Sequence, residues 1–258
     1  APVALRPWYV DAKGWAMEED YSAFIEDRRA EILQRVDASL AVSGRTRDEV
    51  ELVAVSKTVG LMQVLAAIDA GYRVFGENRP QELHRKLEGL ELVQETRPVR
   101  FDMIGNLQTN KINAVLGRIH SIGTMHLAEA VSSRVLRRLD AGELVVPQRV
   151  LIEVNVSGEE TKGGFSPDEL RRSMDELQNL CGIRIEGLMT MAPRGDKSRA
   201  RACFAGLREL RDELRVSSGL ELRELSCGMS EDYEIALEEG STIVRLGRVV
   251  FDPSFEVL

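Results

Sequence analysis

The feature of this sequence that most constrains its fold is a repeated alternation between short β-rich segments and segments with helical periodicity. Strands that alternate with helices form parallel βαβ units, and eight such units can close into a barrel. We therefore predict an α/β fold, a single (β/α)8 TIM barrel; an open, doubly wound sheet is the alternative. The eight predicted strands are residues 52–56, 72–75, 100–104, 118–122, 149–156, 183–188, 222–226 and 242–246.

The chain length and the absence of internal boundaries favour a single barrel domain. The 258 residues suffice for one such barrel, and neither a linker-like change in composition nor a low-complexity segment interrupts them. Apolar residues recur at helical spacing from Phe24 to Leu40, which predicts an opening helix. We therefore expect an N-terminal extension over residues 1–21 and a ligand-binding barrel over residues 22–258.

Composition excludes several classes of function. The formal net charge of −8 argues against nucleic-acid or membrane partners, because binding to those surfaces depends on clustered Lys and Arg. The sequence shows neither a run of eighteen apolar residues nor an N-terminal signal peptide. Three unpatterned cysteines and three scattered histidines predict no disulfide framework and no metal site. The few cysteines favour a reducing cytoplasm. The negative net charge still allows a local basic pocket for one small phosphate.

Lys57 stands where a (β/α)8 barrel carries its functional groups, at the carboxyl end of the first predicted strand. The preceding apolar residues should be buried, and we expect Lys57 to share that burial. A buried ammonium group is costly, so burial favours the neutral amine, which is the form that condenses with an aldehyde. The alternative is a structural lysine whose amine reaches solvent at the barrel mouth.

The ends of the last two predicted strands have the composition of a phosphate site. In such barrels the loops after these strands and a helix N-terminus often bind phosphate. Ser230 precedes a helical segment, 231–237, that Gly240 ends, so we predict Ser230 as its N-cap, facing an anion. Gly247 would allow close backbone approach and the Arg248 amide would add a donor. Alternatively, Ser230 only caps its helix and Gly247 only makes a turn.

Arg245 lies inside the last predicted strand and should point into the barrel. A buried arginine needs an acceptor because it does not lose its proton. The acceptor could be a strand carboxylate or the ring nitrogen of a bound pyridine. A lysine at one strand end and a phosphate loop at two others together favour a phosphate-bearing aldehyde as the ligand.

Seven segments, in order along the chain, carry a resemblance to a known family. The chain resembles the pyridoxal phosphate homeostasis proteins, whose barrel is similar to the N-terminal domain of alanine racemase. The ordered set extends from residue 52 to residue 247 and is more specific than any one segment. The segments are LVAVSKT (52–58), FGEN (75–78) with QE (81–82), IGNLQTNK (104–111), VNVSGEE (154–160), GLMT (187–190), LSCGMS (225–230) and VRLG (244–247).

The resemblance implies a pyridoxal 5′-phosphate (PLP) site. It implies that Lys57 holds PLP as a Schiff base and that Arg245 faces the pyridine nitrogen, which keeps that nitrogen unprotonated and weakens the ring as an electron sink. It also implies a role in intracellular PLP homeostasis without robust turnover, with PLP-dependent apoenzymes as possible recipients. The remaining residues that it assigns to the cofactor site are Asn78, Ser230, Gly247 and Arg248.

The chain departs from the family pattern at two positions. Phe101-Asp102 stands where the family usually has an aromatic residue and a histidine, and Gly123 stands where it usually has an aspartate. Neither departure changes the predicted lysine, arginine or phosphate loop. Both make it less safe to carry over contacts with other ligands or partners at that part of the rim.

Two enzyme classes are the alternatives to a PLP carrier. A racemase needs a second proton donor on the far face of the cofactor, which alanine racemases take from a tyrosine in another domain across a dimer. None of the four tyrosines stands at a strand end that would face a ring, and the sequence ends at Leu258, so we expect a monomeric carrier. A Schiff-base aldolase would also use a lysine and a phosphate loop, but its lysine more often lies late in the barrel.

Overall fold

The computed structural model describes residues 19–107 and 117–256, and it confirms the predicted barrel. Eight parallel strands form a closed sheet in the order of the sequence. The closure is made between the first and last strands, where Val53 lies opposite Arg245. The strands are β1 (Glu51–Val55), β2 (Val74–Glu77), β3 (Arg100–Met103), β4 (Ile119–Ile122), β5 (Gln148–Glu153), β6 (Ile183–Met189), β7 (Glu224–Ser226) and β8 (Ile243–Leu246).

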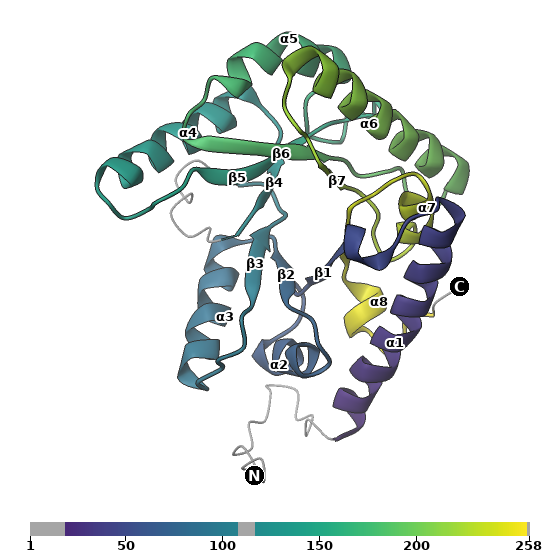
Figure 1. The fold of residues 1–258 in the computed structure, drawn as a ribbon. Helices are drawn as coiled ribbons and strands as arrows, with labels where there is room; N and C mark the ends of the chain where they lie inside the picture. The colour runs from purple at the N-terminus through teal and green to yellow at the C-terminus, as the bar shows by residue number, and fades with distance from the viewer. Residues whose placement is uncertain (1–18, 108–116, 257–258) are drawn as a thin grey trace.

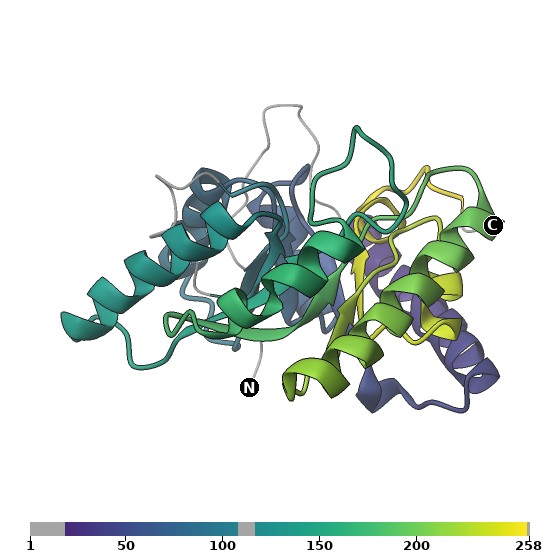
Figure 2. The ribbon, with the colours of Figure 1, turned by 90° about the horizontal axis from the view of Figure 1, so that it is seen from above.

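The helices lie outside the ring of strands (Figures 1 and 2). The opening helix α1 packs against α2, α7 and α8, where the two ends of the barrel meet. The helical elements are α1 (Glu19–Val42), η1 (Arg47–Glu49), α2 (Leu61–Asp69), α3 (Pro80–Leu92), α4 (Met125–Asp140), α5 (Pro167–Gln178), α6 (Lys197–Ser218), α7 (Tyr233–Glu238) and α8 (Arg248–Phe251). None of these helices is long and apolar enough to cross a membrane.

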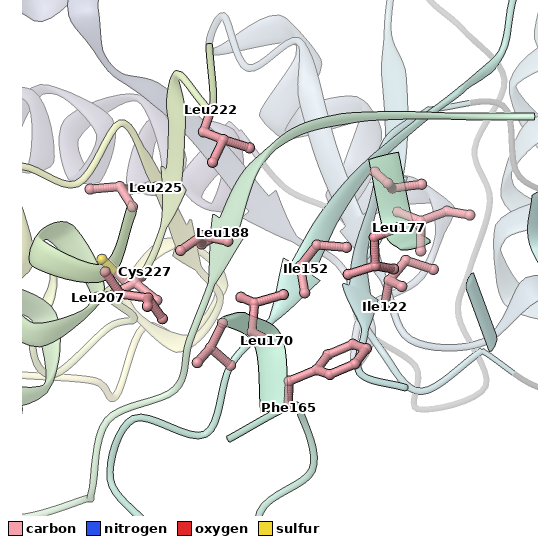
Figure 3. Close-up of a cluster of buried hydrophobic side chains, with 14 of the residues drawn as sticks. Ile122, Ile152, Phe165, Leu170, Leu177, Leu188, Leu207, Leu222, Leu225 and Cys227 are labelled. Atoms are coloured by element: carbon pink, nitrogen blue, oxygen red, sulfur yellow. The ribbon is translucent and has the colours of Figure 1, made fainter. Parts of the chain in front are cut away.

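Apolar side chains fill the layer between helices and strands. One cluster joins β3–β7 to α4–α6, and Figure 3 shows part of it around Leu170, Leu188 and Phe165. A second cluster joins α1–α3, α7 and α8 to β1, β2 and β8. The barrel interior differs, because buried polar side chains lie on strands beside a small apolar group. Such interiors are usually filled by branched apolar residues, so these polar groups require an explanation.

Local sequence signals explain where several elements begin and end. A capping box at Ser166 starts α5: the Ser166 Oγ accepts from the Glu169 amide at 3.2 Å, and Pro167 is the first residue of the helix. The fifth strand ends at Glu153, three residues earlier than predicted, because Asn155 starts a turn by accepting from the Gly158 amide. Residues 1–18 lie outside the described part of the chain, so the predicted extension over residues 1–21 stays a prediction.

Candidate functional site

A cavity of about 1550 Å³ opens at the carboxyl ends of the strands. All six residues that the sequence predicts for one site line this cavity, although they come from four different parts of the barrel. These residues are Lys57, Asn78, Ser230, Arg245, Gly247 and Arg248. The predicted segment 108–111 lies outside the described residues.

Lys57 lines this cavity, but it is exposed and not buried as predicted. The reason is local. Strand β1 ends at Val55, burial ends at Ser56, and the Val59 amide donates to the Ser56 carbonyl at 3.1 Å in the turn that follows. The amine therefore stands at the rim of the cavity, where a ligand can reach it, and burial is not what would activate it.

The backbone that presents Lys57 is fixed from below by a buried polar cluster. The Ser56 hydroxyl donates to the Glu77 carboxylate at 2.6 Å. The Lys86 ammonium donates to the same carboxylate and to the Ser56 carbonyl. Both charged side chains are almost fully buried, so the pair holds only because each charge has a partner. Sequence reasoning missed Lys86, whose only signal is a lysine on the apolar side of α3.

The residues predicted to bind phosphate lie together around the start of α8, but the local structure at Ser230 differs from the prediction. Helix α7 begins at Tyr233 and not after Ser230, and Asp232 occupies its N-cap position. Instead, the Ser230 hydroxyl accepts from the Val249 amide in the first turn of α8, at 3.2 Å. Ser230 and Gly247 therefore flank the start of α8 from two loops.

The start of α8 leaves room and donors for an anion. A methyl group added at Gly247 would meet only Val55, at 3.5 Å, so packing within the protein does not require glycine there. The Arg248 amide is at the first helical position, where no acceptor exists within the helix. The Arg248 guanidinium pairs with Glu231 and lies 5.1 Å from the Phe255 ring centre, so its backbone amide is the better anion donor.

Arg245 points into the barrel, and its side chain is buried. Its Nη1 donates to the carbonyl and the hydroxyl of Ser226, at 2.8 and 2.6 Å, and its Nη2 donates to the Thr190 carbonyl at 3.2 Å. Burial lowers the pKa of Arg245, while the charges of Asp232 and Glu153 act in the other direction. The alternative of a salt bridge with a strand carboxylate is wrong for the described residues, among which no carboxylate lies within 4.0 Å.

Glu153 lines the cavity, and the sequence analysis did not single it out. It ends β5, and burial raises the pKa of its carboxyl group, against the charge of Arg245. Glycines border it: methyl groups added at Gly123 and Gly163 would lie 3.4 and 3.8 Å from its oxygens. The predicted strand ran to Val156, which hid that Glu153 stands at a strand end.

The described residues fit a ligand that has an aldehyde, a ring nitrogen and a phosphate. Lys57 supplies an accessible amine, and Arg245 keeps its Nε and one Nη2 hydrogen outside the protein hydrogen bonds given above. The start of α8 supplies amides and an uncrowded glycine. Across residues 19–107 and 117–256, no group of three or more His, Cys, Asp or Glu is placed to hold a metal ion.

The closed barrel and this cavity define a class of protein. The family model of the alanine racemase N-terminal domain matches residues 33–254. Solved alanine racemases share the fold: that of Corynebacterium glutamicum superposes with a TM-score of 0.60 at 14% identity, over 86% of this chain and 62% of the racemase. The chain is thus a barrel of the alanine racemase N-terminal domain class.

Relatives at higher identity narrow the class. The pyridoxal phosphate homeostasis protein of Aquifex aeolicus is 38% identical over 229 residues, covering 87% of this chain and 96% of that protein. Its counterpart in Pseudomonas aeruginosa is 35% identical, covering 88% and 94%. The structure of PipY from Synechococcus elongatus with PLP bound gives a TM-score of 0.74 at 31% identity, covering 88% and 99%. This chain belongs to the pyridoxal phosphate homeostasis family.

Proposed function

We propose that this chain binds PLP covalently through Lys57 and serves PLP homeostasis, without robust catalytic turnover. The observation that carries the proposal is the single cavity that brings the Lys57 amine together with Arg245 and the start of α8. The relatives' name and the PLP in the Synechococcus PipY structure support the same ligand. The family resemblance alone would not place these groups around one space.

Each residue has a role that follows from its chemistry. The cofactor supplies an aldehyde, with which a neutral lysine amine condenses with loss of water. Lys57 would supply this amine from the rim of the cavity, and the Arg245 donors that Ser226 and Thr190 leave unused would face the ring. The Ser230 hydroxyl and the Gly247 and Arg248 amides would hold the phosphate at the start of α8. Asn78 lines the same space from the end of β2.

The described tyrosines support a carrier over a racemase. A racemase needs a second proton donor that faces the cofactor. The Tyr21 hydroxyl donates to the Phe251 carbonyl at 3.0 Å, outside the cavity. The Tyr72 and Tyr233 hydroxyls are fully buried, and burial raises the pKa of each phenol well above its ordinary value. Tyr233 is among the residues that line the cavity, but its hydroxyl is buried, so none of these three hydroxyls is placed to exchange a proton with a ligand there.

The open mouth of the cavity also suits loading and transfer. We propose that the protein acts as a monomer in the cytoplasm and that PLP-dependent apoenzymes receive its cofactor. Size-exclusion chromatography with light scattering would test the first point. Transfer of radiolabelled PLP from the loaded protein to an apo-aminotransferase, faster than PLP release into buffer, would test the second.

The test of the proposed function is covalent trapping. The purified protein is incubated with PLP, its absorption spectrum is recorded, and the complex is reduced with borohydride and mapped by mass spectrometry. We expect a pyridoxyl-phosphate adduct on Lys57, lost in Lys57→Ala. Lys197→Ala is the matched control, because Lys197 is another exposed lysine that lines the same cavity, and it should keep the adduct.

Two outcomes would contradict the proposal. Absence of an adduct in excess PLP would remove PLP as the ligand, and trapping of a sugar phosphate instead would favour an aldolase. An adduct on a different lysine would refute the role of Lys57. Turnover assays with amino acids on the loaded protein then separate a carrier from a racemase.

A further inference from the structure

A continuous line of buried polar side chains crosses the interior of the barrel and ends at Arg245. The His120 ring, on β4, stands at its centre. Its Nε2 lies 3.1 Å from the Asp102 Oδ2 on β3, and its Nδ1 lies 2.9 Å from the Ser226 Oγ on β7. The same Ser226 oxygen accepts from Arg245 on β8 at 2.6 Å. Asp102, His120 and Ser226 have no exposed surface, and Arg245 is 5% exposed.

The Asp102 end of the line is an anion. Its Oδ1 accepts from the Arg100 Nε and from the Arg118 amide, both at 2.8 Å, and its Oδ2 accepts from the Arg100 Nη2 at 3.0 Å. Burial acts to raise the pKa of Asp102, but the hydrogen bonds from His120 and Arg100 hold it well below its ordinary value. An ionised carboxylate only accepts hydrogen bonds, so the facing nitrogen of His120 must carry a hydrogen.

The direction of the remaining hydrogen bonds follows from the two ends. His120 Nδ1 is the acceptor within hydrogen-bond distance of the Ser226 hydroxyl among the described residues, so that nitrogen carries no hydrogen and the ring is neutral with one N–H. Burial, which lowers the pKa of His120 against its contacts with Asp102, acts in the same direction. With that hydrogen on Nε2, Nδ1 accepts from the Ser226 hydroxyl. The Ser226 oxygen then offers its lone pairs to Arg245, whose guanidinium only donates. Every member of the line is satisfied in one arrangement of hydrogens.

This line acts on the group that faces the ligand. Among the described residues no carboxylate lies within 4.0 Å of the Arg245 guanidinium. The carboxylate of Asp102 is connected to it only indirectly, through the neutral His120 ring and the Ser226 hydroxyl. Three of the five N–H donors of Arg245 are held by Ser226 and Thr190, which leaves Nε and one Nη2 hydrogen for the cavity. If Ser226 lost its acceptor role, one held donor would become free and the guanidinium could turn.

We propose that Asp102, His120 and Ser226 form a positioning relay that fixes the orientation of the Arg245 guanidinium and thereby sets how tightly the cavity binds its cofactor. The naming of that cofactor rests on the proposed function. The relay itself does not, because its hydrogen positions belong to the cofactor-free protein. A simple space-filling role would not require this direction of hydrogen bonds, since apolar residues fill such interiors at lower cost.

The decisive variant is Asp102→Asn, which keeps the shape of the side chain and replaces an anion by an amide. The amide can donate to His120 Nε2, which would move the ring hydrogen to Nδ1 and turn the Ser226 hydroxyl away. Nitrogen NMR of the histidine rings, on cofactor-free protein, should show the His120 hydrogen on Nε2 in the wild type and on Nδ1 in this variant. A structural role alone would not predict that exchange.

The second readout is binding of PLP itself. Ser226→Ala removes the acceptor nearest to Arg245, and we expect its dissociation constant for PLP to rise about tenfold, as for a lost hydrogen bond to a charged group. The absorption band of the bound cofactor should shift as the donors at its ring change. Ser132→Ala is the matched control, because Ser132 is also buried and its hydroxyl accepts from the Gly182 amide at 3.0 Å, outside the line that ends at Arg245.

Either of two results would overturn the proposed relay. One is a wild-type His120 that carries its hydrogen on Nδ1, and the other is a Ser226→Ala protein that binds PLP like Ser132→Ala with an unshifted band. If Asp102→Asn does not fold, the wild-type NMR measurement and the smaller Ser226→Ala change still decide. A wild type that traps no PLP would refute the proposed function, whereas the NMR measurement would still test the relay.

Discussion

At the scale of single residues, the cavity wall contains both basic and acidic side chains. Arg245 carries a positive charge into the cavity wall, yet Glu153 places a carboxyl group in the same wall. No side-chain cation or hydroxyl within the described residues pairs with Glu153, and burial raises its pKa. Such a group is a cost to folding unless a ligand uses it.

We therefore predict that Glu153→Gln stabilises the cofactor-free protein at pH 7. A raised pKa means that the folded protein holds this proton more tightly than the unfolded chain, so stability is lost as pH rises above the ordinary value of 4.5. Glutamine removes that loss, and we expect a gain of about 1 kcal/mol at pH 7 that vanishes below pH 4. Thermal unfolding at both pH values measures it, with the exposed Glu160→Gln as control. An equal gain at both pH values would contradict this explanation.

At the scale of elements, α8 is a helix of four residues whose position matters more than its length. It begins where β8 leaves the barrel, and the Ser230 hydroxyl reaches its first turn from the loop after β7. Gly247 precedes it without any internal packing reason to be glycine. These three features support the phosphate site proposed at the start of α8.

Gly247→Ala tests this explanation. The added methyl group would make only an ordinary contact with Val55 at 3.5 Å, and the φ of −108° is open to any L residue, so thermal stability should change little. The methyl group would narrow the space for the phosphate, and we expect PLP to bind about tenfold more weakly, which equals about 1.4 kcal/mol. Pyridoxal, which has no phosphate, is the control ligand and should bind as before. A parallel loss of pyridoxal binding would point to a general distortion of the cavity.

Elements also show how much the sequence could predict. Eight periodic segments were enough for the barrel, because period and order are local signals. The start of α7 was not predictable, since Ser230 and Asp232 are both good N-caps and stand two residues apart. The exposure of Lys57 depended on where β1 stops, which local propensity does not fix.

The relay was beyond sequence reasoning for a different reason. The three residues of the relay, Asp102, His120 and Ser226, span 124 positions of the sequence. They meet only because β3, β4 and β7 face the same barrel interior. The sequence did mark Asp102 as a departure from the family pattern. It could not supply the partner that gives this aspartate its role.

At the scale of the whole molecule, the barrel has a charged floor at the amino ends of its strands and the cavity at their carboxyl ends. Arg118 is buried in the floor, where Glu51 and Glu186 each accept from it at 2.9 Å. Arg149 adds a bond to Glu186 at 2.8 Å. The floor closes the barrel opposite the cavity, so it should govern stability without governing ligand affinity.

Glu186→Gln separates those two properties. Burial acts to raise the pKa of Glu186, but hydrogen bonds from Arg149 and the charge of Arg118 lower it to about 2. A lowered pKa gives stability that is present above the ordinary value of 4.5 and is lost as pH falls toward 2. We expect the variant to lose about 1.5–3 kcal/mol at pH 7, the range for hydrogen bonds to charged groups, and to show a flatter stability profile between pH 4.5 and 2.

Glu221→Gln breaks only an exposed pair with Arg223 and should cost less than about 1 kcal/mol. PLP affinity, measured at neutral pH and at a temperature where both variants are folded, should match the wild type in each. If Glu186→Gln weakened PLP binding as much as it lowered stability, the floor and the cavity would be one coupled unit. The separation would then fail, because disorder among the floor charges would reach Arg245 through Asp102, which shares Arg100 with Glu51.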